Sequence, residues 1–150
     1  MPRGFENRVR KDPFWFGYIG GMTQEKFREV LDEKRYSYEI EGDKIIVTHK
    51  GNVDLGSLTS LPPDVEFKNG GYVWLSELTS LPPGMEFGNK GRVYLNSLTS
   101  IPPGVEFKNR GHINLKSLMD GFFNDWKGNI KGIDSKRLLN KMISLGLFER

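Results

Sequence analysis

Few residues of the chain have the chemistry that catalysis requires. There are two histidines, His49 and His112, and no cysteine. A catalytic triad places a histidine between a nucleophile and an orienting acid, and no nearby Ser/Asp pattern of that kind accompanies either histidine. A zinc site needs several imidazole, thiolate or carboxylate ligands. We therefore expect a non-enzymatic protein with no catalytic residue, metal or other cofactor, and both histidines as ordinary surface or edge side chains.

Three glutamates recur at intervals of twenty residues and could attract cations. They are Glu66, Glu86 and Glu106. If they lie on stacked strands, their carboxylates form a row spaced by about 5 Å, which costs stability unless the charges are paired. Lys68 and Lys108, two residues further along, are available as partners. We favour a solvated face with local pairing; the alternative is a stripe that binds a cation or a basic partner.

The residue types best suited to protein binding occur in two columns with the same interval. Core and turn positions are nearly copied from unit to unit, whereas these outward positions vary and become aromatic. Tyr, Trp and Arg are enriched at interface hot spots, and an exposed aromatic cluster is uncommon without a partner. The alternative is that a cap or the N-terminal arm covers the cluster. The first column is Asn52, Tyr72, Arg92 and His112, the second is Asp54, Trp74, Tyr94 and Asn114, and the predicted partner-binding residues are Tyr72, Trp74, Arg92, Tyr94 and His112.

The N-terminal arm is the second aromatic segment. The stretch "RKDPFWFGYIGG" at 10–21 contains four aromatic residues within five positions. So apolar a segment packs on the rest of the protein, inserts into a partner or mediates self-association, and we favour the first. Because insertion into a partner is the alternative, Trp15 and Phe16 are added to the predicted partner-binding residues.

Basic residues of the arm offer an alternative function, which is nucleic-acid binding. Aromatic and basic residues together can stack on bases and neutralise phosphates of a single strand. A groove that follows a nucleic-acid backbone needs a continuous basic stripe, and residues 51–120 carry six Lys/Arg against seven Asp/Glu. The signal is thus confined to the ends of the chain, with Arg3, Arg8, Arg10 and Lys11 as the candidate nucleic-acid contacts.

The elements that position these residues come from an internal repeat. Residues 51–110 form three consecutive units, "GNVDLGSLTSLPPDVEFKNG", "GYVWLSELTSLPPGMEFGNK" and "GRVYLNSLTSIPPGVEFKNR", and a partial fourth starts at Gly111. Each unit predicts two short strands with inward apolar residues, separated by an extended Pro-Pro segment. One coil cannot bury its own apolar face, but stacked coils form a continuous core. The predicted inward positions are Val53, Leu55, Leu58, Leu61, Val65 and Phe67 and their equivalents in later units.

The repeated "L-T-S-L-P-P" and the fixed period carry a resemblance to a known family. Over residues 51–118 the chain resembles leucine-rich repeats, especially short bacterial repeats of about twenty residues. The units also look like those of small bacteriophage and prophage reading frames. Both resemblances imply a binding scaffold rather than an active site. A horseshoe and a flatter β-helical coil both remain open.

Both ends of the solenoid are expected to be covered, and the whole chain to form a single domain. After the arm at 1–22 we predict a helix and hairpin cap at 23–50, about 3.5 coils at 51–118, and a helical cap at 119–150, hence a β-rich α+β fold. Phe122, Phe123 and Trp126 would close the last coil. The C-terminal helix would begin at Asp134 or Ser135, bury Leu138, Leu139, Met142 and Ile143, and end at Gly146.

Composition sets the remaining expectations. The sequence has 150 residues, a net charge of +3, no transmembrane-length apolar run and no recognisable signal peptide, so we expect a cytosolic protein, in the bacterial host cytosol if a phage encodes it. The expected function is binding of a protein partner. By analogy with the phage repeats, a specific version is an anti-CRISPR-type inhibitor of a bacterial defence complex, which is a nucleoprotein. A self-associating structural phage component is a further alternative.

Overall fold

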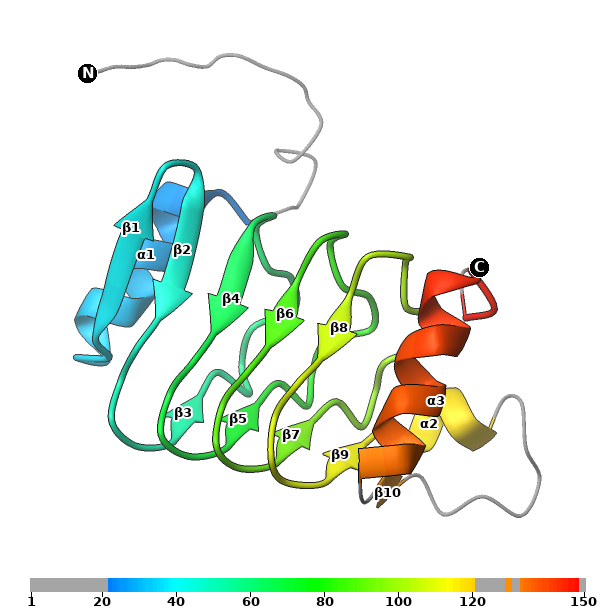
Figure 1. Ribbon diagram of the computed structural model, residues 1–150. Coiled ribbons are helices and arrows are strands. Elements are labelled where there is room, and N and C mark those ends of the chain that lie inside the picture. The colour runs from blue at the N-terminus through cyan, green and yellow to red at the C-terminus, as the bar shows by residue number, and fades with distance from the viewer. Residues whose placement is uncertain (1–21, 121–128, 131–132, 149–150) are drawn as a thin grey trace.

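The computed structural model describes residues 22–120, 129–130 and 133–148 (Figure 1). Ten strands in two sheets and three helices lie in this part of the chain. In chain order they are α1 (Gln24–Glu33), β1 (Tyr38–Glu41), β2 (Lys44–Val47), β3 (Val53–Asp54), β4 (Val65–Phe67), β5 (Val73–Trp74), β6 (Glu86–Phe87), β7 (Val93–Tyr94), β8 (Glu106–Phe107), β9 (Ile113–Asn114), α2 (Lys116–Asp120), β10 (Asn129–Ile130) and α3 (Ile133–Ser144).

The strands form a β-solenoid of about four parallel coils, close to the 3.5 coils that the repeat predicts. Sheet A has the strand order β1-β2-β4-β6-β8, and sheet B has the order β10-β9-β7-β5-β3. All neighbours are parallel except the terminal pairs β1–β2 and β10–β9. The register is a shift of one repeat, so that Val53 lies beside Val73 and Phe67 beside Phe87. Each outward residue therefore lies beside its equivalent in the next coil.

The core between the sheets consists of the predicted inward residues. Phe67, Phe87 and Phe107 stack face to face, with ring centroids 5.5 and 5.0 Å apart and interplanar angles of 9° and 7°. The inward valines and leucines of both sheets are fully buried. One expected core position differs, because Leu58 in the first coil is only partly buried, whereas its equivalent Leu78 is fully buried.

Small and polar residues at one corner let the coils stack closely. A Cβ atom on Gly91 would lie 2.8 Å from the carbonyl carbon of Gly71 in the preceding coil, which leaves no room for a side chain. Beside this corner, the buried Asn89 amide donates hydrogen bonds to the carbonyls of Gly71, Gly91 and Arg92, at 3.0, 3.1 and 3.1 Å. Each of these carbonyls also accepts a hydrogen bond from a backbone amide, that of Gly91, Gly111 or Val73, so the asparagine adds a second donor at the corner.

The N-terminal end is covered by α1 and the β1–β2 hairpin. Thr23 caps α1 by accepting a hydrogen bond from the Lys26 amide at 3.1 Å, and the helix buries Phe27 and Leu31. The hairpin is also more than a cap, because β2 pairs in parallel with β4 and so begins sheet A. Its other strand, β1, is the edge of that sheet.

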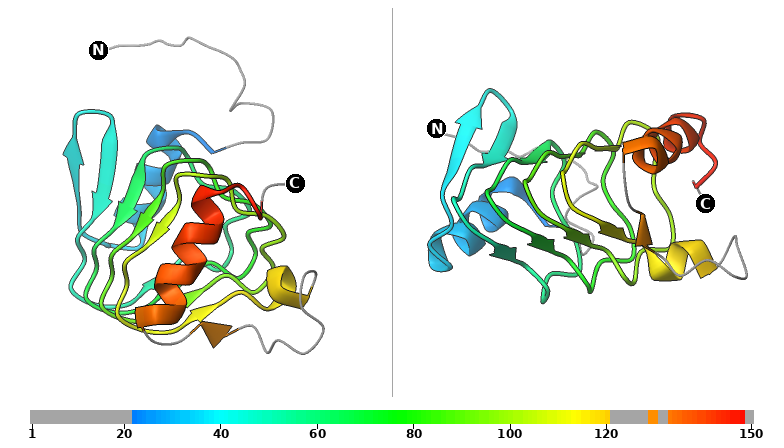
Figure 2. Two further views of the ribbon diagram at one scale, coloured as in Figure 1. Left: turned by 45° about the vertical axis from the view of Figure 1, so that its right-hand side comes forward. Right: turned by 60° about the horizontal axis from the view of Figure 1, so that its bottom comes forward.

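The C-terminal end is covered by α3, which lies across the last coil (Figure 2, left). β8 is the last strand of sheet A, so the backbone of Phe107 has no partner strand on its outer side. The Asn140 side chain takes that place: its oxygen accepts from the Phe107 amide at 2.9 Å and its nitrogen donates to the Phe107 carbonyl at 3.0 Å. One turn earlier, Lys136 donates to the Asn109 carbonyl at 2.6 Å. The unpaired backbone at this edge of sheet A is thus satisfied by side chains of one helix.

Two details of α3 differ from the sequence prediction. The helix begins at Ile133, so Asp134 and Ser135 lie inside it rather than starting it. Leu138 is 62% exposed instead of buried, because Lys136, Leu139, Asn140 and Ile143 form the side that faces the coil. The end is as predicted, with Gly146 at φ +76°. The expected plug of Phe122, Phe123 and Trp126 lies outside the described residues.

Candidate protein-binding face

Sheet B carries the predicted aromatic columns on its outer side. Trp74 lies beside Asp54 and Tyr94 in register, and Tyr94 lies beside Asn114. The strands β3, β5, β7 and β9 lie in one row (Figure 2, right). Because strands in a sheet are about 4.8 Å apart, these side chains form one continuous surface along that row. Equivalent positions of successive repeat units are therefore adjacent in space.

Three aromatic rings are in mutual contact on this surface. The centroids of Trp74 and Tyr94 are 4.6 Å apart with the rings tilted by 34°. Tyr72 meets Trp74 at 6.1 Å and Tyr94 at 5.9 Å, both edge to face. Such pairs contribute about 0.5–1.5 kcal/mol each beyond their buried area. The cluster is therefore ordered before any partner arrives, and this reduces the entropic cost of binding.

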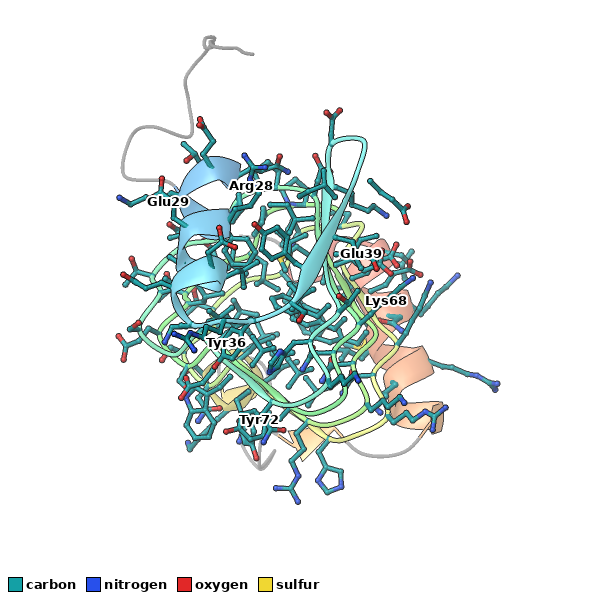
Figure 3. All side chains as sticks on the ribbon, turned by 90° about the vertical axis from the view of Figure 1, so that its left-hand side faces the viewer. Arg28, Glu29, Tyr36, Glu39, Lys68 and Tyr72 are labelled. Carbon is teal, nitrogen blue, oxygen red and sulfur yellow. The ribbon has the colours of Figure 1, made fainter. Side chains whose placement is uncertain are left out.

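Arg92 extends the cluster with a cation. Its guanidinium lies 3.4 Å from the Tyr94 hydroxyl, to which it donates a long hydrogen bond. Arg92 is exposed, and Trp74 exposes 38% of its surface, whereas Tyr72 and Tyr94 are partly buried by their neighbours. We call Tyr72, Trp74, Arg92 and Tyr94 together the aromatic face. Figure 3 shows Tyr72 pointing outward from the solenoid, on a different side from Lys68 of sheet A.

Gly56 positions the indole of Trp74, which the sequence analysis did not anticipate. A Cβ atom at Gly56 would lie 2.7 Å from Cδ1 of Trp74, so the indole rests on the bare backbone of the preceding coil. The equivalent positions of the next two coils carry Ser76 and Asn96. The signal was present in the sequence, since the one glycine at this position belongs to the coil beside the tryptophan.

The remaining sequence candidates are distributed as follows. His112 is partly buried and belongs to the column of Tyr72 and Arg92. His49 is part of the N-terminal packing, where its Nδ1 accepts a hydrogen bond from the Ser37 amide at 3.4 Å and its ring lies 4.9 Å from that of Tyr36. Outside the described residues lie Trp15, Phe16, Arg3, Arg8, Arg10 and Lys11.

The glutamate row of sheet A is paired with lysines, as the favoured interpretation predicts. Glu66 is buried, which differs from the expected outward exposure, and lies 3.4 Å from Lys44 and 3.3 Å from Lys68. Lys108 is shared by Glu86 and Glu106, at 3.9 and 3.6 Å. Local pairing therefore accounts for this row without a bound cation.

The comparisons give no functional assignment. Family models, curated proteins and solved structures were compared with the chain, and none of them matches it. In the part of the chain that the structure describes, no helix has the length and apolar character needed to cross a membrane. Within the same residues, no group of three or more His, Asp or Glu side chains could hold a metal ion.

Proposed function

We propose that the protein is a non-enzymatic binding module and that the aromatic face contacts another protein. The observation that carries this proposal is the contact cluster of Tyr72, Trp74 and Tyr94 on the outer side of sheet B. These rings are not needed for the core, which lies on the other side of the same strands. Rigid aromatic side chains beside an arginine are the usual composition of an interface hot spot.

The repeat architecture supports this role. Each coil copies its inward residues and its corner asparagine, while the outward residues of sheet B differ from coil to coil. Solenoids offer extended surfaces of this kind for binding. In the finer form of the proposal, the chain is a leucine-rich-repeat-like, phage-encoded cytoplasmic inhibitor of a bacterial defence complex. That form rests on the resemblance of the "L-T-S-L-P-P" units to short bacterial and phage repeats, which is an analogy.

The test is capture of a partner from a bacterial lysate by the tagged full-length protein. The wild type is compared with Trp74→Ala/Tyr94→Ala, which removes the centre of the aromatic face. The matched control is Leu138→Ala/Leu145→Ala, since these two residues, in α3 and directly after it, are each 62% exposed and do not belong to the aromatic face. We expect the wild type and the control to capture the same protein, and the aromatic variant to lose it.

The same experiment separates the alternatives. Undiminished capture by an aromatic variant that unfolds at the wild-type temperature would refute the proposal. Capture that disappears after nuclease treatment, and that falls steeply with salt, would instead favour nucleic-acid binding through Arg3, Arg8, Arg10 and Lys11. Formation of large homo-oligomers without any captured protein would favour the structural role.

A further inference from the structure

A pocket of about 430 Å³ lies where α3 meets the last coil of sheet A. This volume is in the range of small-molecule sites. The pocket shares no residue with the aromatic face, because it is lined by β8, the corner that follows β8, and α3, whose places Figure 1 shows. Its lining residues are Phe107, Lys108, Asn109, Arg110, Lys136, Arg137 and Asn140.

The charge of this lining is entirely positive. Four of the seven lining residues are cationic, and none is a carboxylate. Lys108 is shared with Glu86 and Glu106 outside the pocket, so its charge is already partly compensated. Arg110 is exposed, and the structure places no carboxylate within ion-pair distance of it among the described residues.

Lys136 is the strongest feature of the site. It is 8% exposed, and the one hydrogen bond that the structure gives its ammonium group is the donation to the Asn109 carbonyl. An ammonium group has three donors, so two of them have no partner among the described residues. Desolvation by burial lowers the pKa of Lys136 from its ordinary value. A buried cation of this kind is costly unless an anion compensates it.

The arrangement selects a particular kind of anion. A nucleic-acid backbone is best matched by cations spread along a stripe, whereas Arg110 and Lys136 converge on one pocket. An arginine supplies a planar pair of donors that fits phosphate oxygens, and a lysine supplies a compact point charge. A terminal phosphate, with about two negative charges near neutral pH, is the group that such a pair of cations neutralises.

We propose that this pocket binds a phosphate monoester group, with Arg110 and Lys136 as its principal ligands. Lys108 and Arg137 add positive charge at the rim, and the volume beyond the phosphate is available to the organic part of the ligand. Asn140 is held by its two hydrogen bonds to Phe107 and forms a fixed wall of the pocket. This site is independent of the proposed protein-binding function.

The test is titration of the full-length, ¹⁵N-labelled protein with inorganic phosphate, followed by amide chemical shifts. The titration is made at about pH 8, where phosphate is mostly dianionic, and sodium chloride keeps the ionic strength constant. We expect saturable shifts at Asn109, Arg110 and Arg137. Because one charge-assisted contact is lost, Arg110→Gln should weaken binding about tenfold or more.

Two further variants distinguish the loss of a charge inside the pocket from the loss of a charge elsewhere on the protein. Lys136→Gln removes the charge but keeps a donor, and should weaken phosphate binding as strongly as Arg110→Gln. Lys90→Gln is the matched control, since Lys90 is the equivalent of Arg110 one coil earlier and does not line the pocket; its affinity should equal that of the wild type.

Three results would overturn the proposal. The first is the absence of saturable shifts at the pocket, and the second is equal weakening by Lys90→Gln and Arg110→Gln. The third is binding of an oligothymidylate without terminal phosphates at the same amides and with affinity at least equal to that of inorganic phosphate. That last result would assign these cations to a nucleic-acid backbone.

Discussion

At the scale of single residues, the buried asparagines hold one corner of the coils together. Asn69, Asn89 and Asn109 lie at equivalent positions, and each amide nitrogen donates to at least two backbone carbonyls of its own and the following coil. All three are buried. A hydrogen bond of this kind contributes about 0.5–1.5 kcal/mol net to stability.

We predict that Asn89→Ala destabilises the protein by about 1–3 kcal/mol, because the side-chain hydrogen bonds to three carbonyls are lost in the middle of the solenoid, although each carbonyl keeps its backbone donor. Urea unfolding followed by circular dichroism measures the change. Asn52→Ala serves as the control, since Asn52 is exposed and accepts a single hydrogen bond, from the Tyr72 amide. Equal midpoints for the two variants would show that the corner is held in some other way.

A second prediction at this scale concerns Gly56. In Gly56→Ala the new Cβ would displace the Trp74 indole, so the aromatic face should be disturbed while the core stays intact. We expect a change of less than about 1 kcal/mol in stability, a shifted indole N–H resonance of Trp74, and about tenfold weaker partner binding. Ser57→Ala, an exposed neighbour, is the control. An unchanged Trp74 resonance in Gly56→Ala would argue against this support.

At the scale of elements, the two ends of sheet A are closed by different devices. At the N-terminal end, β2 is joined to β1 by a short turn, and the sheet ends in a strand with two exposed glutamates, Glu39 and Glu41. Charged residues on an edge strand discourage pairing with another chain. At the C-terminal end, Asn140 of α3 replaces the missing strand.

We predict that Asn140→Leu destabilises the protein by about 2–4 kcal/mol, because both the amide and the carbonyl of Phe107 lose their partner. The exposed edge should also promote self-association, which sedimentation velocity detects. Asn140→Asp is the graded comparison, since its carboxylate still accepts from the Phe107 amide but cannot donate to the carbonyl. If Asn140→Leu unfolds at the wild-type denaturant concentration and self-associates no more than the wild type, α3 does not protect this edge.

The elements also show what the sequence can predict. Every residue of the repeat has an equivalent twenty positions away, so strands, inward residues and neighbouring outward residues follow from the period. The aromatic face was predictable for that reason, since Tyr72, Trp74, Arg92 and Tyr94 occupy equivalent positions of adjacent coils.

Contacts between the repeat and residues outside it were not predictable from the sequence. Asn140 bonds to Phe107, which is 33 residues earlier, and Lys136 bonds to Asn109, which is 27 residues earlier; neither spacing belongs to the repeat. From the helical pattern of α3 alone, Leu138 was predicted to be buried. That prediction was wrong because the pattern does not show which side of the helix contacts the last coil. The basic pocket depends on the same docking and was missed for the same reason.

At the scale of the whole molecule, both ends of the solenoid are covered, so the outer sides of the two sheets are its main exposed surfaces. The stacked core fixes the spacing of the strands, and the strands fix the aromatic face of sheet B. Sheet A carries paired charges along most of its length. The molecule thus presents one aromatic side, which we propose for a protein partner, and one basic pocket at the C-terminal end.

The most direct test of the central claim is the affinity of the purified captured partner, measured by isothermal titration calorimetry. Two hot-spot aromatic residues together contribute enough that Trp74→Ala/Tyr94→Ala should bind about a hundredfold more weakly than the wild type. Leu138→Ala/Leu145→Ala should stay within about threefold of the wild type, since it lies outside the aromatic face. Wild-type affinity in a Trp74→Ala/Tyr94→Ala variant of unchanged stability would contradict the account.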